Sequence, residues 1–240
     1  GLGDVYKRQQ LPMDRIEAGI AKLVEAKSDT LEAGHTAACS IMTTDTISKE
    51  IAVSFELDGK EITVGGMSKG SGMIHPNMCT MLAYITTDMA ISKELLQEAL
   101  STSVVDTFNM ITVDGDTSTN DTCLVMANGM AGNTEVTQKG EAYDKFFEAL
   151  NYVCTYLAKK MAGDGEGATK LFEAKVVNAR SKEDARTLSR AIVGSNLSKA
   201  AIYGCDANFG RFLCAMGYSG AQFDPVSYTH LRAHETPEHL

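Results

Sequence analysis

Three features that would place a protein in a well-known class are missing from this sequence. No apolar run reaches the ~18 residues that a membrane-spanning helix needs, and no charged-then-apolar signal segment opens the chain. The 22 basic residues are outnumbered by 31 acidic ones, and no basic stripe is available to bind nucleic-acid phosphates. We therefore expect neither a membrane protein nor a nucleic-acid-binding protein, and a cytoplasmic location follows by default.

The cysteines and histidines also lack the spacing of a metal or redox site. No two of the six cysteines form the C-x-x-C pair that is typical of zinc sites and thioredoxin-like active sites. Free cysteines are usually buried, so reduced core thiols are expected. Three of the five histidines gather near the end of the chain, on a segment without a folded frame, and no metal site is expected there. These histidines are His230, His234 and His239.

The two ends of the chain differ from its body. Residues 1–9 are polar and non-periodic, and residues 226–240 hold three of the five histidines and one of the four prolines. Both resemble translated sequencing-adapter read-through and, like a tag, carry no information about the fold. The whole chain contains 44% hydrophobic and 22% charged residues, which is an ordinary composition for a globular protein. A polar stretch before residue 140 predicts a boundary between a main domain, 10–139, and a C-terminal lobe, 140–225.

Helical and strand patterns alternate along the body, which predicts an α/β fold. A hairpin is expected around Asp58 and Gly59, and Ser92 and Ser181 are expected to cap helices. Helices are predicted at 13–27, 92–108, 140–161, 181–193 and 208–216, and strands at 51–57, 61–65, 81–86, 110–113, 122–127 and 171–179. Residues 40–46 are predicted to form a buried strand or the exit from one.

A glycine-rich segment runs directly into an apolar strand at residues 69–82, with the sequence KGSGMIHPNMCTML. Gly70 and Gly72 permit close approach to a ligand, and Thr80 stands at the junction with the strand. The phosphate-binding pattern G-x-x-x-x-G-K-[ST] is absent, because Lys69 precedes the glycines. Taken alone, a threonine at this place is an ordinary strand residue.

Several strings together resemble the ornithine acetyltransferase family, the bifunctional glutamate N-acetyltransferases and amino-acid acetyltransferases of arginine biosynthesis. The segment around Thr80 is similar to the self-cleavage region of that family. The other matching strings follow in the family's order and cover nearly all of residues 11–225. They are IMTTD (41–45), VDGDTSTNDT (113–122), GEGATK (165–170) and DANFGRFLCAMGYSGAQFDP (206–225).

The resemblance implies an enzyme that cuts its own chain between Cys79 and Thr80. The Thr80 hydroxyl would attack the carbonyl of Cys79, and hydrolysis of the resulting ester would leave Thr80 with a free α-amine. Such an amine, with a reference pKa of ~7.7–8.0, can serve as general base for its own hydroxyl. Thr80 would then take acetyl from N-acetylornithine and pass it to glutamate through an acetyl-Thr80 intermediate.

The resemblance also implies substrate-binding roles for Thr43, Lys69 and Glu166, beside Thr80 itself. It implies no cofactor and no metal, with acetyl-CoA as a candidate co-substrate. The implied fold is a four-layer α/β/β/α sandwich of the type shared with self-processing aminopeptidases, with a smaller C-terminal α/β lobe. The two-chain products are expected to assemble as αβ units into a higher homo-oligomer.

The segment Asp114 to Asp121 has the acidic look of a calcium loop. An EF-hand starting at Asp114 requires glycine at its sixth position and glutamate at its twelfth, where this sequence has Thr119 and Val125. We reject calcium binding and expect a polar turn that supports the active site.

The sequence departs from the family at both ends. The family's oxyanion-stabilising Thr-Gly pair would fall on Tyr6 and Lys7, and its C-terminal substrate-binding Asn and Thr would follow well beyond Pro225. One oxyanion donor contributes ~10²- to 10³-fold in rate. A truncated, inactive fragment of the enzyme is therefore one alternative. A self-processing aminopeptidase of related architecture is another.

Overall fold

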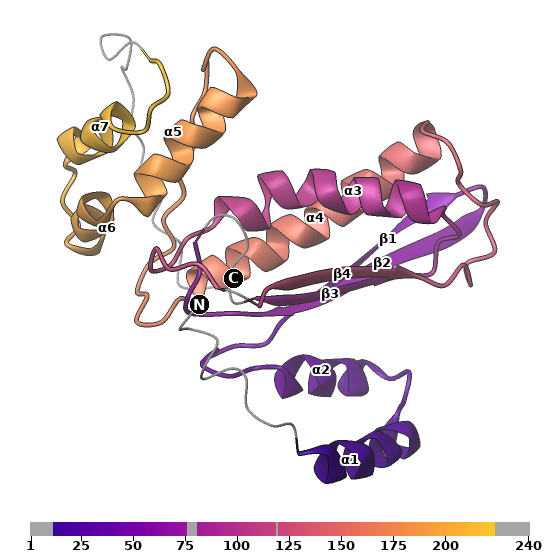
Figure 1. The fold of residues 1–240 in the computed structure, drawn as a ribbon. Helices are drawn as coiled ribbons and strands as arrows, with labels where there is room; N and C mark the ends of the chain where they lie inside the picture. The colour runs from indigo at the N-terminus through magenta and orange to yellow at the C-terminus, as the bar shows by residue number, and fades with distance from the viewer. Residues whose placement is uncertain (1–11, 76–80, 119, 224–240) are drawn as a thin grey trace.

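The computed structural model describes residues 12–75, 81–118 and 120–223 (Figure 1). They form an α/β fold, as the alternating pattern predicted. Ser92 and Ser181 cap their helices as expected, each accepting a backbone N–H from the first turn. The elements are α1 (Met13–Ala26), α2 (Leu31–Ser40), β1 (Lys49–Leu57), β2 (Lys60–Lys69), β3 (Leu82–Thr87), α3 (Lys93–Asp106), the 3₁₀ helix η2 (Phe108–Met110), β4 (Thr122–Ala127), α4 (Glu141–Gly163), α5 (Lys182–Gly194), α6 (Asn196–Tyr203) and α7 (Phe209–Gly217).

The four strands form one mixed sheet in the order β1-β2-β3-β4. β1 and β2 are an antiparallel hairpin, whose turn residues Asp58 and Gly59 both have positive φ (51° and 71°). This conformation matches the twist of the flanking strands and explains the strong turn signal of Asp-Gly. β3 runs antiparallel to β2 and parallel to β4. Because β3 begins just after Thr80, the sheet fixes the chain on the C-terminal side of the predicted cut.

Helices α3 and α4 cover one face of the sheet and enclose the main core (Figure 1). The buried positions of α4 recur at helical spacing, and they pack against alternate strand residues such as Ile62, Val64 and Ile85. Gly66 permits this close approach, since a Cβ there would lie 3.0 Å from Val153 and 3.1 Å from Leu157. Thus α4, although it follows the predicted boundary at residue 140, belongs to the main core.

Among the described residues, few cover the opposite face of the sheet. Helix α2 contacts β1 and β2 on this side, and α1, below it in Figure 1, has no buried residue. Leu124 and Met126 of β4 are exposed, whereas Val125 between them packs against the core. The described residues contain a single sheet, so the second sheet of the four-layer sandwich stays a prediction.

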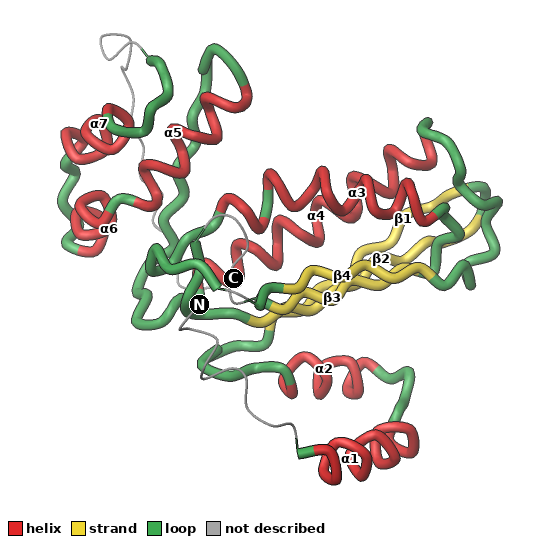
Figure 2. The backbone as a smooth tube through the Cα atoms, viewed as in Figure 1, coloured by secondary structure: helices red, strands yellow, loops and turns green. Residues whose placement is uncertain are grey.

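Helices α5, α6 and α7 gather apart from the sheet (Figure 2). They enclose a second, smaller hydrophobic cluster built around Leu188, Ile192 and Phe212. The strand predicted at 171–179 is wrong. Phe172, Ala174 and Val176 alternate as in a strand and pack against this cluster, but within the described residues the segment pairs with no other strand.

Two further local predictions are also wrong. Residues 40–46 form the end of α2 and the turns after it instead of a strand, because Thr30 caps a helix that reaches Ser40. The apolar residues at 110–113 follow the 3₁₀ helix and form no strand.

The expectation of core thiols fails for most cysteines. Of the five described cysteines, Cys154 is buried and Cys123 is intermediate. The exposed ones are Cys39, Cys205 and Cys214, and Cys79 lies outside the described residues. Within the same described ranges, no helix is long and apolar enough to cross a membrane.

Candidate active site

Two of the predicted substrate-binding residues are in direct contact. Lys69, the last residue of β2, donates a hydrogen bond from Nζ to Oγ1 of Thr43, at 3.1 Å. Thr43 lies in the turns between α2 and β1, so the contact joins segments 26 residues apart. A threonine hydroxyl beside a lysine ammonium is suited to bind a carboxylate, because both can donate hydrogen bonds to its oxygens.

Glu166, the third predicted residue, lies against the glycine-rich segment. Its backbone N–H donates to the carbonyl oxygen of Ser71, at 2.7 Å. Its carboxyl group lies over Gly72, where an added Cβ would be 2.8 Å from Glu166 Cδ. The glycine at position 72 therefore makes room for this carboxylate beside the segment that leads to the cut.

Asp45 fixes the backbone on both sides of the Lys69–Thr43 contact. Its carboxylate accepts the N–H of Thr43 at 3.1 Å and the N–H of Gly70 at 2.7 Å. It also accepts a bond from Lys49 Nζ, which bonds in turn to Asp164. Burial raises the pKa of Asp45, but these three hydrogen bonds outweigh it and hold the pKa below its usual range.

Two aspartates hold the backbone on either side of the predicted cut. Asp114 accepts the N–H groups of Met73 and Ile74, at 2.5 and 3.0 Å. Asp121 accepts the N–H of Met81, at 3.1 Å. The polar turn that the sequence predicted between these aspartates thus contacts both flanks of the segment that contains Cys79 and Thr80. Cys79 and Thr80 themselves lie outside the described residues.

His75, on the same segment, lies 3.1 Å from the Thr112 hydroxyl through Nδ1. Burial lowers the pKa of His75, and the positive charges of Arg190 and Lys199 lower it further. The imidazole is therefore mainly neutral at pH 7.

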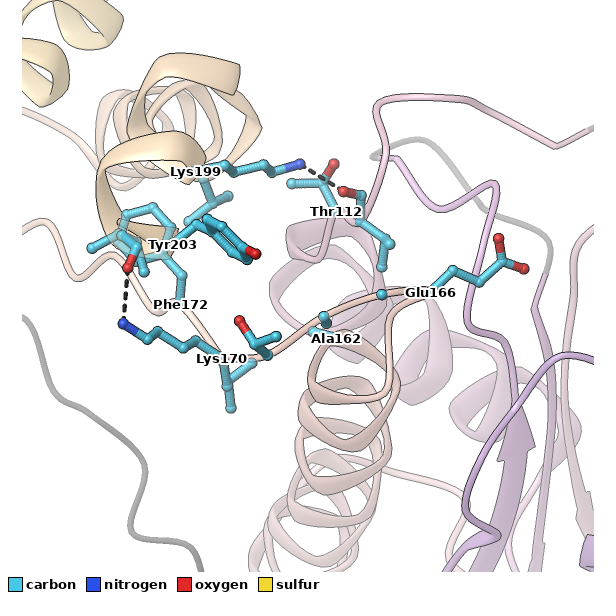
Figure 3. Close-up of a pocket in the computed structure, with 14 residues that line it drawn as sticks. Thr112, Ala162, Glu166, Lys170, Phe172, Lys199 and Tyr203 are labelled. Carbon is cyan, nitrogen blue, oxygen red and sulfur yellow. Dashed lines mark hydrogen bonds between the residues drawn. The ribbon is translucent and has the colours of Figure 1, made fainter. Parts of the chain in front are cut away.

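A hollow of about 210 Å³ adjoins this region, between the connection from α4 to α5 and helix α6. Figure 3 shows Lys170, Lys199 and Tyr203 around it, while the Glu166 carboxylate points away from them. Lys199 donates to the carbonyl of Val113 at 2.8 Å, and burial lowers its pKa. Among the residues that the structure describes, no group of histidine, cysteine and carboxylate side chains could hold a metal ion.

Comparison with known protein families identifies the family of this chain. The sequence profile of the ArgJ family matches residues 7–235. The chain belongs to the ArgJ family. This confirms the resemblance found in the sequence, and the match extends into both end segments.

Individual ArgJ relatives agree with this assignment. The arginine biosynthesis bifunctional protein ArgJ of Symbiobacterium thermophilum is 55% identical over 215 residues, covering 90% of this chain and 53% of that protein. The protein of the same name from Staphylococcus aureus strain COL is 51% identical over 229 residues, covering 95% of this chain and 54% of its own length. The chain thus spans about half the length of the curated ArgJ proteins that it matches.

A solved ArgJ structure is similar as well. The arginine biosynthesis bifunctional protein ArgJ of Bacillus halodurans superposes with a TM-score of 0.57 and 50% identity, over 59% of this chain and 66% of that one. The likeness supports the arrangement of sheet and helices described above.

In this ArgJ-family chain, Lys69 and Thr43, both predicted from the sequence, contact each other, and Glu166, the third predicted residue, lies against Gly72. The sequence did not reveal the side chains that hold them. Asp45 stands in the IMTTD string, but nothing in the sequence marks its role, and Lys49 and Asp164 lie in stretches that read as ordinary polar sequence. Tyr6 and Lys7, at the place of the family's oxyanion pair, lie outside the described residues.

Proposed function

We propose that the protein of which this chain forms about half is a self-cleaving acetyltransferase of arginine biosynthesis, a glutamate N-acetyltransferase. It moves acetyl from N-acetylornithine to glutamate. Its site is formed by Thr80 as nucleophile and by Thr43, Lys69 and Glu166 as substrate-binding residues.

The reaction runs in two stages at the same hydroxyl. First, the Thr80 oxygen attacks the Cys79 carbonyl carbon and the peptide C–N bond breaks, which frees the α-amine of Thr80 and leaves an ester. Water then hydrolyses this ester to a Cys79 carboxylate and the free Thr80 hydroxyl. That amine then takes the hydroxyl proton as Thr80 attacks the acetyl group of N-acetylornithine, and ornithine leaves. Glutamate's amine finally attacks acetyl-Thr80 and regenerates the hydroxyl.

The observation that supports the proposal is that the three predicted binding residues contact one another or the glycine-rich segment that precedes the predicted cut. The Lys69 ammonium and Thr43 hydroxyl, 3.1 Å apart, are suited to the α-carboxylate of an amino acid. The Glu166 carboxylate over Gly72 is suited to an ammonium group, the other charge of ornithine. Two charges of opposite sign, presented by separate segments, match a zwitterionic amino-acid substrate.

The proposal is tested with two proteins. The first is the 240-residue chain itself, whose intact mass under denaturing conditions reports on the cut between Cys79 and Thr80. The second, here called the completed enzyme, joins residues 12–223 to the flanking segments of the Symbiobacterium thermophilum relative, since the chain covers 53% of that protein. We expect the completed enzyme to transfer acetyl from N-acetylornithine to glutamate, and its Thr80→Ala variant to be uncut and inactive.

The same assays separate the alternatives. An inactive fragment would leave the 240-residue chain uncut while the completed enzyme turns over. A self-processing aminopeptidase would be cut, would hydrolyse peptides and would ignore N-acetylornithine. The relatives are named bifunctional, so acetyl-CoA is tested as a second acetyl donor. Formation of acetylglutamate from acetyl-CoA and glutamate would add amino-acid N-acetylation to the proposed activity.

We further propose that the whole protein has the four-layer sandwich and assembles from αβ units in the cytoplasm. Met67, Tyr84 and Leu124 are neighbours across three strands on the face of the sheet opposite α3 and α4, and such an apolar row is suited to pack against a second sheet. A crystal structure of the completed enzyme, together with its mass by light scattering, tests both statements.

A further inference from the structure

A buried ion triad is hydrogen-bonded to, or adjoins in the chain, the segments that carry the three proposed substrate-binding residues. It consists of Asp45, Lys49 and Asp164, whose side chains are 0%, 0% and 4% exposed. Lys49 Nζ is 2.7 Å from Asp45 Oδ1 and 2.6 Å from Asp164 Oδ2, so one ammonium bridges two carboxylates. None of the three takes part in the chemistry proposed above.

The first carboxylate of the triad holds the segments of Thr43 and Lys69. Asp45 accepts the backbone N–H of Thr43 itself and that of Gly70, the residue after Lys69. The peptide groups from which the two side chains extend are thereby fixed to one anchor, consistent with the 3.1 Å contact between Lys69 and Thr43.

The second carboxylate holds the segment of Glu166. Asp164 caps the C-terminal end of α4, two residues before Glu166, and accepts the N–H of Thr46 at 3.0 Å and the hydroxyl of the same residue. Ser71 provides a second connection between the same segments. Its hydroxyl lies 2.6 Å from the hydroxyl of Thr44, and its carbonyl oxygen accepts the backbone N–H of Glu166 at 2.7 Å. Lys49 is therefore one of the links between the Glu166 segment and the segments of Thr43 and Lys69, and the one that joins the two buried carboxylates.

Stability alone is a poor explanation for this arrangement. Burying charges is costly, and apolar residues of similar volume commonly replace buried ion pairs with neutral or favourable effect on stability. What apolar side chains cannot supply is a set of directed bonds to backbone groups of separate segments. We propose that the Asp45–Lys49–Asp164 triad is a positioning device, which sets the distance between the carboxylate-binding pair and Glu166. This rests on the proposed function of those residues.

The test uses the completed enzyme with a neutral triad, D45N/K49M/D164N. Asparagine keeps one acceptor oxygen, so the asparagine at position 164 can still accept the N–H of Thr46, while the one at position 45 can accept only one of its two backbone N–H groups. No unpaired charge is buried, so the cost in stability is smaller than that of removing one charge alone. The ammonium bridge between the two halves is lost. We expect the KM for N-acetylornithine to rise at least roughly tenfold, with kcat changed less than about threefold, since the substrate-binding residues and not the nucleophile are displaced.

A single variant and a control complete the design. Asp164→Asn leaves the Asp45–Lys49 pair intact and weakens only the link to Glu166, so a smaller rise of KM is expected. It decides the matter if the triple variant does not fold. Lys139→Met removes the lysine of an exposed ion pair with Glu98, and no change of KM is expected.

The outcomes keep the two proposals apart. If the unmutated completed enzyme transfers no acetyl from N-acetylornithine, the proposed function is wrong, and the positioning role falls with it. If that enzyme is active and a folded, cut triad variant keeps its KM, only the positioning role is wrong. A folded variant that is no longer cut would place the triad in self-processing, and would also overturn the proposal.

Discussion

The carboxyl group of Glu166 occupies the space that a side chain at Gly72 would need. An ideal Cβ on residue 72 would lie 2.8 Å from both Cδ and Oε1 of Glu166. Two segments that are distant in sequence therefore depend on each other, because the glycine permits the position of the carboxylate.

Gly72→Ala should weaken substrate binding without unfolding the protein. The added methyl group would push the Glu166 carboxylate aside, because that carboxylate is the flexible partner in the contact. We expect the KM of the completed enzyme for N-acetylornithine to rise roughly tenfold, equivalent to about 1.4 kcal/mol. Gly19→Ala, in α1 where an added Cβ meets nothing within 4 Å, is the matched control. Equal KM values for both variants would argue against a role of Glu166 in binding.

Thr43→Val should have a similar effect through Lys69. Valine keeps the shape of threonine but cannot accept the 3.1 Å hydrogen bond from Lys69 Nζ or donate to a substrate. A hydrogen bond to a charged group contributes about 1.5–3 kcal/mol, so a rise in KM of roughly tenfold or more is expected. Steady-state kinetics with N-acetylornithine measure it, and a serine variant, which keeps the hydroxyl, should restore most of the affinity.

Asp114→Ala should slow self-cleavage. Asp114 accepts the N–H groups of Met73 and Ile74, which lie shortly before the predicted cut. Without these bonds the segment is held less firmly, and attack by a misplaced hydroxyl is slower. Intact mass measured at intervals during refolding gives the fraction of chains that are cut. We expect this fraction to rise more slowly in the variant than in the unmutated protein. Asp116→Ala, in the same turn, is the control. Residue 116 bonds to Asp114 through its backbone N–H, so this substitution keeps that bond and removes only an exposed carboxylate.

The sequence predicted those parts of the fold whose signals are local. The Asp58-Gly59 turn and the caps at Ser92 and Ser181 depend on neighbouring residues only, and all three formed as expected. The strand predicted at 171–179 failed because alternation of Phe172, Ala174 and Val176 reports a buried face but not a pairing partner.

The site followed the same rule. Motif strings predict Thr43, Lys69 and Glu166 as binding residues, because each lies in a segment that resembles the family's sequence. The triad escaped notice because it is assembled over long range. Lys49 and Asp164 are 115 residues apart, and neither residue type at its position indicates burial, since charged residues are almost never fully buried unless paired.

The buried and the exposed cysteines should differ in their reactivity toward alkylating reagents. Burial raises the pKa of Cys123 to about 12 and that of Cys154 to about 11, so both stay protonated and inert. Cys39, Cys205 and Cys214 are exposed and should be labelled by iodoacetamide in the native protein. Peptide mass mapping after labelling at pH 8, with and without denaturant, shows the division. Native labelling of Cys154 would mean that the main core is open.

Stability should fall at acidic pH through the ion triad. Hydrogen bonds from Lys49 and from backbone groups outweigh burial and lower the pKa values of Asp45 and Asp164 in the folded state. The unfolded state, with carboxyl pKa values near ~3.9, therefore binds protons first as the pH falls. The stability that these groups contribute is complete above the unfolded pKa and is lost as the pH falls through the lower, folded values.

Urea unfolding of the 240-residue chain at several pH values between 7 and 3 measures this dependence. In Asp164→Asn the midpoint should fall less steeply below pH ~4, because one of the two linked carboxylates no longer titrates. Part of the slope should remain, since the hydrogen bond from Arg186 lowers the pKa of Asp106 as well. Glu17→Gln, an exposed carboxylate on α1, controls for the change of net charge. If Asp164→Asn and Glu17→Gln show the same pH dependence as the unmutated chain, Asp164 is not ion-paired in solution, and the positioning role would lose its physical basis.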